Sequence, residues 1–152
     1  SFLNYLRQIP IIMEINMLVR LLYVSREINN EIANLAETSL DRFRESNTQN
    51  DITGVLCEGE GLFLQVLEGE RSNVNKLYAS ILRDTRHKDI ELLYFEEIKE
   101  RFFDGWTMEY IHIKFLYQAI KQKHPDFDPY VYPGKLSIKI VMDYLKAEDA
   151  GQ

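Results

Sequence analysis

The stretch "EGLFLQVLEGE" (residues 60–70) carries an apolar run from Leu62 to Leu67 that is interrupted only by Gln65. Side chains alternate between the two faces of a strand, and both alternating sets are apolar here, which predicts a strand buried on both faces. The primary amide of Gln65 has two donors and two acceptor sites, and burying it without partners costs roughly 1–3 kcal/mol. The sequence therefore predicts a central strand and a polar group that hydrogen-bonds this amide.

The segments around this strand predict a mixed fold. Residues 52–57 form the other arm of a hairpin through the turn "EGEG", and three further β-rich runs cover residues 17–25, 90–98 and 106–113. Apolar residues at helical spacing predict one helix over residues 30–45, capped by Asn29 or Asn30, and a second over residues 71–86, capped by Ser72 or Asn73. The order βαββαββ predicts an α+β, ferredoxin-like sheet with two helices on one face.

The composition changes after Ile113. Three of the four prolines fall between residues 114 and 134, and an apolar pattern at helical spacing follows over residues 135–148. This pattern predicts a helix, an irregular link and a second helix. We expect these C-terminal helices to pack on the other face of the sheet or on another subunit.

Composition narrows the class of protein. The chain has 152 residues, 45% of them hydrophobic, and a formal net charge of −6 with its basic residues scattered, which favours one globular domain without nucleic acid as a partner. No window approaches the roughly 18 apolar residues of a membrane span, so no membrane partner is expected. The single cysteine, Cys57, excludes an internal disulfide and favours a cytoplasmic location.

The sequence contains no hydrolase, phosphate-binding or metal-binding motif. Four polar or large side chains nevertheless stand at strand positions where small apolar residues are usual: Tyr23, Gln65, Trp106 and Met108. Tyr23 and Gln65 could point toward one gap beneath the helices and form a polar ligand slot. Alternatively, Tyr23 is a half-buried aromatic with its hydroxyl at the sheet edge, and Gln65 is a satisfied core amide.

Five motifs in a consistent order resemble one known family. They are "RLLYVS" (residues 20–25), "NTQNDITGVL" (47–56), "GLFLQVLEGE" (61–70), "ILRDTRH" (81–87) and "WTM" (106–108). Together they closely resemble the BLUF domain, a blue-light sensor that uses FAD. The resemblance extends over residues 17–113.

The resemblance implies a flavin site. Gln65 would lie beside the flavin ring and share hydrogen bonds with it and with the Tyr23 hydroxyl, which would satisfy the buried amide. The implied cofactor is FAD, with FMN as an alternative. The implied cofactor-binding residues are Asn47 at the polar edge of the ring, Ile52 and Phe63 against its faces, and Asp84, Arg86 and His87 near the ribityl chain and phosphates.

The resemblance also implies a mechanism. Light excites the flavin, an electron and then a proton pass from Tyr23, and the amide of Gln65 ends rotated or tautomerised. Trp106 and Met108 would compete for the position near Gln65 and transmit the change.

We therefore expect a blue-light photoreceptor rather than an enzyme, which signals to a downstream protein and forms homo-oligomers. The expected organisation is an N-terminal extension or cloning remnant (1–16), a flavin-binding domain (17–113) and a C-terminal helical cap (114–152). Two alternatives remain. One is a ferredoxin-like binding module without flavin, which would be colourless, and the other is a redox flavoenzyme, which would be reduced by a nicotinamide cofactor.

Overall fold

The computed structural model of the chain describes residues 1–8, 17–28 and 44–150. Within these residues, five strands form one sheet in the order β4-β1-β3-β2-β5. All neighbouring strands are antiparallel except β2 and β5, which are parallel. The strands are β1 (Leu18–Glu27), β2 (Thr53–Gly59), β3 (Leu62–Glu70), β4 (His87–Ile98) and β5 (Glu109–His112).

The central hairpin follows the prediction. Strands β2 and β3 pair from Thr53 opposite Glu68 to Gly59 opposite Leu62, which leaves a two-residue turn. Both turn residues, Glu60 and Gly61, have positive φ angles of 52° and 79°. This is the geometry of a type I′ turn, whose twist matches that of the strands it joins.

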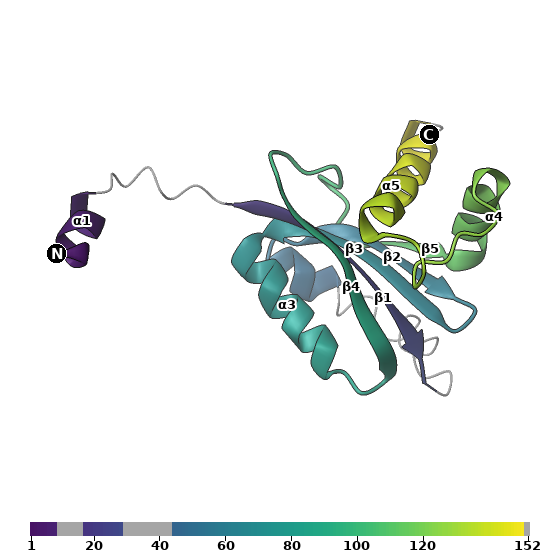
Figure 1. Cartoon of the computed structure of the whole chain (residues 1–152), viewed down its shortest axis with the longest axis horizontal. Helices are drawn as coiled ribbons and strands as arrows, with labels where there is room; N and C mark the ends of the chain where they lie inside the picture. The colour runs from purple at the N-terminus through teal and green to yellow at the C-terminus, as the bar shows by residue number, and fades with distance from the viewer. Residues whose placement is uncertain (9–16, 29–43, 151–152) are drawn as a thin grey trace.

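Helices cover both faces of the sheet, as Figure 1 shows. Helix α3 (Arg71–Arg83) lies on one face, whereas α4 (Ile113–Lys123) and α5 (Gly134–Ala150) lie on the other, which confirms the predicted position of the C-terminal helices. A short helix α1 (Phe2–Gln8) stands apart from the sheet. The predicted helix over residues 30–45 falls almost entirely outside the described residues, and residues 44–49 are helical.

Two hydrophobic cores result from this arrangement. Alternate residues of β1, β2 and β3 belong to opposite cores, so Leu64 and Val66 face α4 and α5 while Phe63 and Leu67 face α3. The continuous apolar run in β3 is explained by these two buried faces. Gln65 has the parity of Phe63 and Leu67, which places its amide on the α3 side.

A buried carboxylate fixes the connection between β4 and β5. Glu68 is fully buried, and its oxygens accept hydrogen bonds from the backbone N–H groups of Phe102 (3.2 Å) and Phe103 (2.7 Å) and from Arg20 Nε (2.8 Å). Arg101 adds a bond to Thr53 Oγ1 at 3.0 Å. These bonds hold the start of the loop that leads to Trp106 and Met108.

Some predicted details were wrong. Helix α3 begins at Arg71 as predicted, but Glu70 rather than Ser72 or Asn73 is its N-cap, and the helix ends at Arg83 instead of residue 86. The last strand begins at Glu109 rather than at residue 106, because the preceding residues bend and the Gly54 N–H donates to the Trp106 carbonyl at 3.0 Å. Trp106 and Met108 therefore precede the strand, and their side chains do not have to follow its alternation between the two faces of the sheet.

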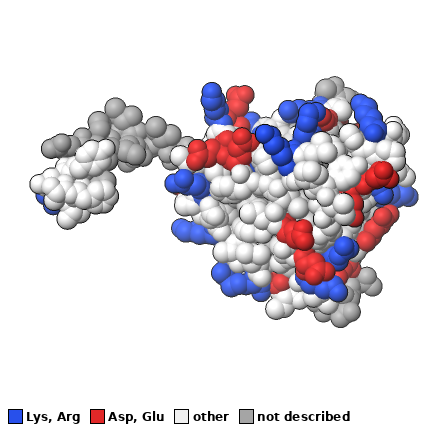
Figure 2. All heavy atoms as spheres, in the orientation of Figure 1, with Lys and Arg blue, Asp and Glu red and all other residues white. Residues whose placement is uncertain are grey.

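The surface charges are mixed. Figure 2 shows Lys and Arg side chains distributed around the visible face and intermixed with Asp and Glu. On this face the described residues form no continuous basic stripe of the kind that follows a nucleic-acid backbone. None of the helices in the described part of the chain is long and apolar enough to cross a bilayer.

Candidate functional site

A hydrogen-bonded chain of three side chains lies on the α3 face of the sheet. Tyr23 on β1 and Gln65 on β3 are directly opposite each other in the strand register. The Tyr23 hydroxyl donates to Gln65 Oε1 at 2.6 Å, and Gln65 Nε2 donates to the sulfur of Met108 at 3.4 Å. The partners of the buried amide are therefore a phenol and a thioether, and one hydrogen and one acceptor site of the amide remain for a ligand.

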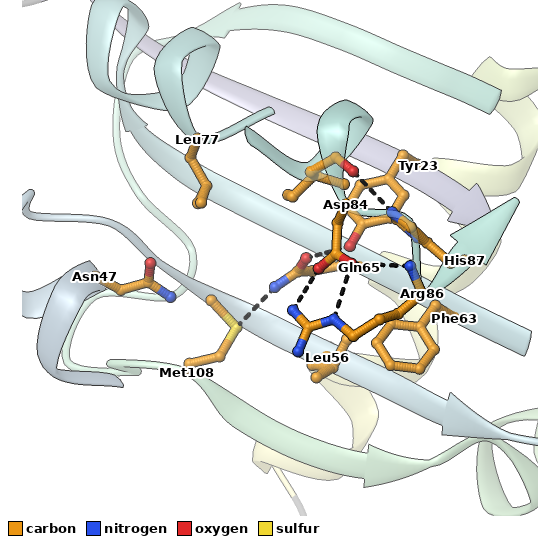
Figure 3. Close-up of a pocket in the computed structure, with 11 residues that line it drawn as sticks. Tyr23, Asn47, Leu56, Phe63, Gln65, Leu77, Asp84, Arg86, His87 and Met108 are labelled. Carbon is orange, nitrogen blue, oxygen red and sulfur yellow. Dashed lines mark hydrogen bonds and ion pairs between the residues drawn. The ribbon is translucent and has the colours of Figure 1, made fainter. Parts of the chain in front are cut away.

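These side chains line a cavity between α3 and the sheet, drawn in Figure 3. Figure 3 shows Asn47 and Met108 on one side, Asp84, Arg86 and His87 on the other, and Gln65 between the two groups. The remaining walls are Tyr23, Leu56, Phe63, Leu77 and Ile81. The cavity is thus largely apolar with a few polar groups that converge on it, as is usual for small-molecule sites.

Asn47 supplies a second buried amide at this cavity. Asn47 is 4% exposed as a whole residue and lines the cavity, so its side-chain amide can hydrogen-bond the polar edge of a ligand there. Two amides at one apolar cavity suit a planar heteroaromatic ring, and the residues present therefore fit a flavin.

Burial keeps Tyr23 protonated. The pKa of its phenol is raised far above the usual value of 10.0, first by desolvation and then by the negative charges that Tyr78 and Asp84 can carry. A protonated phenol donates its hydrogen bond to Gln65 at any physiological pH. The ring of Tyr78 lies 5.9 Å from that of Tyr23, between centroids.

The polar end of the cavity is an ion pair. Arg86 Nε donates to Asp84 Oδ1 at 2.8 Å, and Arg86 Nη2 bonds the other carboxylate oxygen. These hydrogen bonds lower the pKa of Asp84, so the carboxylate is ionised at neutral pH. Arg86 is therefore a partly exposed cation in the lining of the cavity.

His87 is tied to the protein through both ring nitrogens. Nε2 lies 2.7 Å from the carbonyl oxygen of Ile81, and Nδ1 lies 2.8 Å from Ser25 Oγ. A carbonyl only accepts, so Nε2 carries the hydrogen, and Nδ1 of the neutral ring accepts from the Ser25 hydroxyl. His87 thus connects the end of α3 to β1, and no ring nitrogen is left for the phosphate side predicted from the sequence.

Of the other predicted site residues, some line this cavity and others do not. Phe63 lines the cavity, while Ile52 lies in the core beneath α3 and lines an adjacent hollow with Asn47. Met108 reaches the cavity. Trp106 does not, because it packs with Phe102 and Phe103 on the α4 and α5 side of the sheet.

Three lining residues were missed from the sequence: Leu56, Leu77 and Ile81. Leu56 is directly opposite Gln65 in the β2–β3 register, and hairpin alternation would have identified it. Leu77 and Ile81 belong to the apolar face of α3. They could have been predicted as lining residues once that helix was placed over Gln65.

Comparison with known proteins gives a consistent result. The family model "Sensors of blue-light using FAD" (BLUF) matches residues 18–109. The chain is 31% identical over 98 residues to the blue light- and temperature-regulated antirepressor BluF of Escherichia coli, a match that covers 64% of this chain and 24% of that protein. It is 40% identical over 63 residues to the photoactivated adenylate cyclase subunit beta of Euglena gracilis, covering 41% of this chain and 7% of that subunit.

Solved structures agree with the sequence comparisons. The structure titled "BlsA photo-activated state" superposes with a TM-score of 0.71 at 28% identity, and the match covers 84% of this chain and 94% of that one. A match over 84% of the chain is longer than residues 1–109, so it extends beyond the region that the family model covers. By contrast, the chain spans less than a quarter of the length of the two curated relatives.

Proposed function

The chain belongs to the BLUF family, the sensors of blue light using FAD, and we propose that the cavity beneath α3 holds this cofactor and that Tyr23, Gln65 and Met108 form its light-responsive switch. The family description is that of a sensor rather than an enzyme. The observation that carries the proposal is the hydrogen-bonded chain from Tyr23 through Gln65 to Met108 along an apolar cavity.

Each cofactor-binding residue would contact a different part of the cofactor, according to its position in the cavity. Asn47 and Gln65 would hydrogen-bond the polar edge of the ring, while Phe63, Leu56 and the α3 side chains would exclude water from its faces. Arg86, held by Asp84, would meet the phosphate side. Ile52 and His87 would act indirectly, Ile52 by packing beside Asn47 and His87 by fixing the end of α3.

Bound FAD would supply blue-light absorption and, once excited, an electron acceptor. Tyr23 would donate the electron and then its phenolic proton, and the 2.6 Å bond to Gln65 gives that proton an immediate acceptor. The Gln65 amide would then turn or change tautomer, and the electron and proton would return to Tyr23, so that the oxidation state of the cofactor is unchanged at the end. If it turns, Nε2 faces Tyr23 and Oε1 faces the Met108 sulfur, which has no hydrogen to donate.

That rearrangement would give the switch an output. Met108 would lose its hydrogen bond and the segment between Trp106 and β5 would adjust, because both residues belong to it. We propose that the result is a light-dependent contact with a downstream protein, as the name of the E. coli antirepressor suggests for that relative. Residues 114–152 would support this segment as a cap, since α4 and α5 pack against the same sheet face as Trp106.

The absorption spectrum in the dark and directly after blue illumination tests the proposal. A flavin spectrum that shifts slightly to the red and recovers in the dark is the expected result. A sample that remains colourless after reconstitution with FAD would reject flavin binding. A flavin that is instead bleached, and is reduced by a nicotinamide cofactor in the dark, would indicate a redox enzyme.

A further inference from the structure

A buried carboxylate on the far face of the sheet is joined by two hydrogen bonds to the loop that carries Met108. Glu68 has the parity of Leu64 and Val66 on β3, so its side chain lies on the α4 and α5 side. It is fully buried and is not among the described residues that line the cofactor cavity. Any effect of Glu68 on the cofactor site must therefore pass through other residues.

A carboxylate suits this position because both of its oxygens meet N–H groups. Glu68 Oε1 accepts from the Phe103 N–H at 2.7 Å, and Oε2 accepts from the Phe102 N–H at 3.2 Å. Arg20 is directly opposite Glu68 in the strand register, and its Nε and Nη2 lie 2.8 Å and 2.6 Å from Oε2. A glutamine here has only one oxygen to accept these bonds, and its own N–H groups meet the remaining donors.

The backbone is held from this carboxylate as far as Met108. The Trp106 N–H donates to the Phe103 carbonyl at 2.9 Å, and the Gly54 N–H donates to the Trp106 carbonyl at 3.0 Å. Arg44 Nε donates to the Met108 carbonyl at 3.1 Å. The backbone around Met108 is thus fixed by bonds from both faces of the sheet.

These bonds select one conformation of the loop. A buried ion pair is a weak source of stability, because the cost of removing its charges from water offsets much of their attraction. Contacts among the rings of Phe102, Phe103 and Trp106 have no fixed direction and do not define a single arrangement by themselves. The directional bonds to Glu68 do define one, and in it the Met108 sulfur lies 3.4 Å from the nitrogen of the Gln65 amide (Figure 3).

We propose that Glu68, held by Arg20, is a positioning residue of the switch, which brings Met108 back to Gln65 after illumination and so sets the rate of dark recovery. The inference rests on the proposed function, in which Met108 loses its hydrogen bond in the light. Recovery requires the sulfur to return to the amide within hydrogen-bond distance. A loop fixed by Glu68 spends more of its time in that position, so loosening the loop slows recovery.

Glu68→Gln in the full chain loaded with FAD tests the proposal. The decay of the flavin red shift is followed after blue light is switched off. We expect a red shift of normal size and a recovery slowed by about threefold to thirtyfold, in line with the loss of one or two hydrogen bonds. Glu97→Gln makes the same substitution at an exposed glutamate 3.9 Å from Arg71 and should recover within about twofold of the parent rate.

A second readout does not use the photocycle. The chain has four methionines, and isotope labelling of their methyl groups gives Met108 an NMR signal that Met108→Leu identifies. In the dark, Glu68→Gln should shift or broaden this signal. It should also speed amide hydrogen exchange at Phe103, whose N–H loses its acceptor. Glu97→Gln should change neither quantity.

A double-mutant cycle separates positioning from a general loss of stability. The Met108→Leu background has no sulfur to reposition, so Glu68→Gln should change its recovery by less than about twofold. Equal slowing in both backgrounds would mean a general loosening of the fold and overturn the proposal. Unchanged recovery in Glu68→Gln, despite faster exchange at Phe103, would overturn it as well.

The remaining outcomes keep this proposal distinct from the proposed function. If Glu68→Gln does not fold, Arg20→Lys replaces it under the same criteria, since lysine keeps the charge and loses the paired bonds of the guanidinium. A parent chain without a red shift would reject the proposed function, and a Met108→Leu chain without one would leave no cycle. In either case the dark NMR signal of Met108 decides: a change on Glu68→Gln retains the positioning role, and an unchanged signal overturns it.

Discussion

The Tyr23 hydroxyl is the atom on which the proposed light response depends. It donates at 2.6 Å to Gln65, and burial keeps it protonated by raising its pKa. Tyr23→Phe retains the ring and removes only this hydroxyl. We expect the variant to bind FAD and to lose the reversible red shift, at a cost of about 1 kcal/mol in stability for the lost hydrogen bond.

Tyr78→Phe is the matched control for Tyr23→Phe. Its ring is the neighbour of Tyr23 at 5.9 Å, and the substitution is chemically the same. The absorption difference between lit and dark samples is measured for both variants under the same illumination. A normal red shift in Tyr23→Phe, or its loss in Tyr78→Phe alone, would assign the electron and proton donor to a different residue.

Because of Asp84, the free energy of unfolding should depend on pH in the acidic range. Its hydrogen bonds from Arg86 lower the pKa of the folded carboxyl below the usual 3.8. A lowered pKa contributes stability above pH of about 4, and this contribution is lost as the pH falls through the folded value. Asp84→Asn should therefore cost less than about 1 kcal/mol at pH 7 and lose less stability than the parent chain on acidification.

Thermal denaturation between pH 7 and pH 3 measures this effect. Asp104→Asn, at an exposed aspartate of the β4–β5 loop, is the control and should follow the parent chain at every pH. Asp84→Asn with the same loss of stability on acidification as the parent chain would show that the ion pair with Arg86 does not persist in solution.

At the scale of single residues, the sequence predicted the positions governed by strand alternation. Gln65 interrupts an apolar run, and it lies in the cavity with Tyr23 and Met108. The prediction was less complete where a tertiary contact decides the orientation of a side chain. Trp106 packs on the opposite side because its segment bends before β5, and both nitrogens of His87 are engaged by Ser25 and Ile81.

At the scale of elements, the start of α5 lies very close to the backbone of β4. A Cβ added to Gly134 would lie 1.6 Å from the Leu93 carbonyl oxygen. Gly→Ala at an ordinary helical position stabilises by about 0.5–1 kcal/mol. Here the sign should reverse, and Gly134→Ala should destabilise by about 1–3 kcal/mol because α5 must move away from the sheet.

Chemical denaturation compares Gly134→Ala with Lys135→Ala, an exposed neighbour in the same helical turn. The lysine variant should stay within about 0.5 kcal/mol of the parent chain. A stabilised Gly134→Ala variant would mean that α5 does not contact β4 at this point in solution.

Elements were predictable where their signal is local. The turn at Glu60 and Gly61 and the apolar face of α3 are local patterns, and both elements were found. The N-cap of α3 was predicted wrongly because β3 ends at Glu70 and the chain continues directly into the helix at Arg71. The start of β5 was displaced because it depends on pairing with β2, a contact between residues more than 50 positions apart.

At the scale of the whole molecule, the family match ends at residue 109, but the hydrophobic core does not. Leu116 and Ile120 of α4 and Val141 and Leu145 of α5 are buried against the sheet. Removing α4 and α5 would expose this apolar face to water, and a loss of a few kcal/mol is a large fraction of the net stability of a domain, about 5–15 kcal/mol.

Residues 17–112 alone should therefore fail to fold, although they contain every residue of the proposed flavin switch. Without α4 and α5 the sheet exposes Leu22, Val55 and Leu64, an apolar surface that promotes aggregation. The measurement is a thermal scan of this fragment beside the full chain, with FAD present in both samples. A cooperative transition and bound flavin in the fragment would show that the cap is separable. A broad or absent transition would mean that the helices proposed to support the output segment are also part of the fold that holds the sensor together, so any change in their packing must alter both.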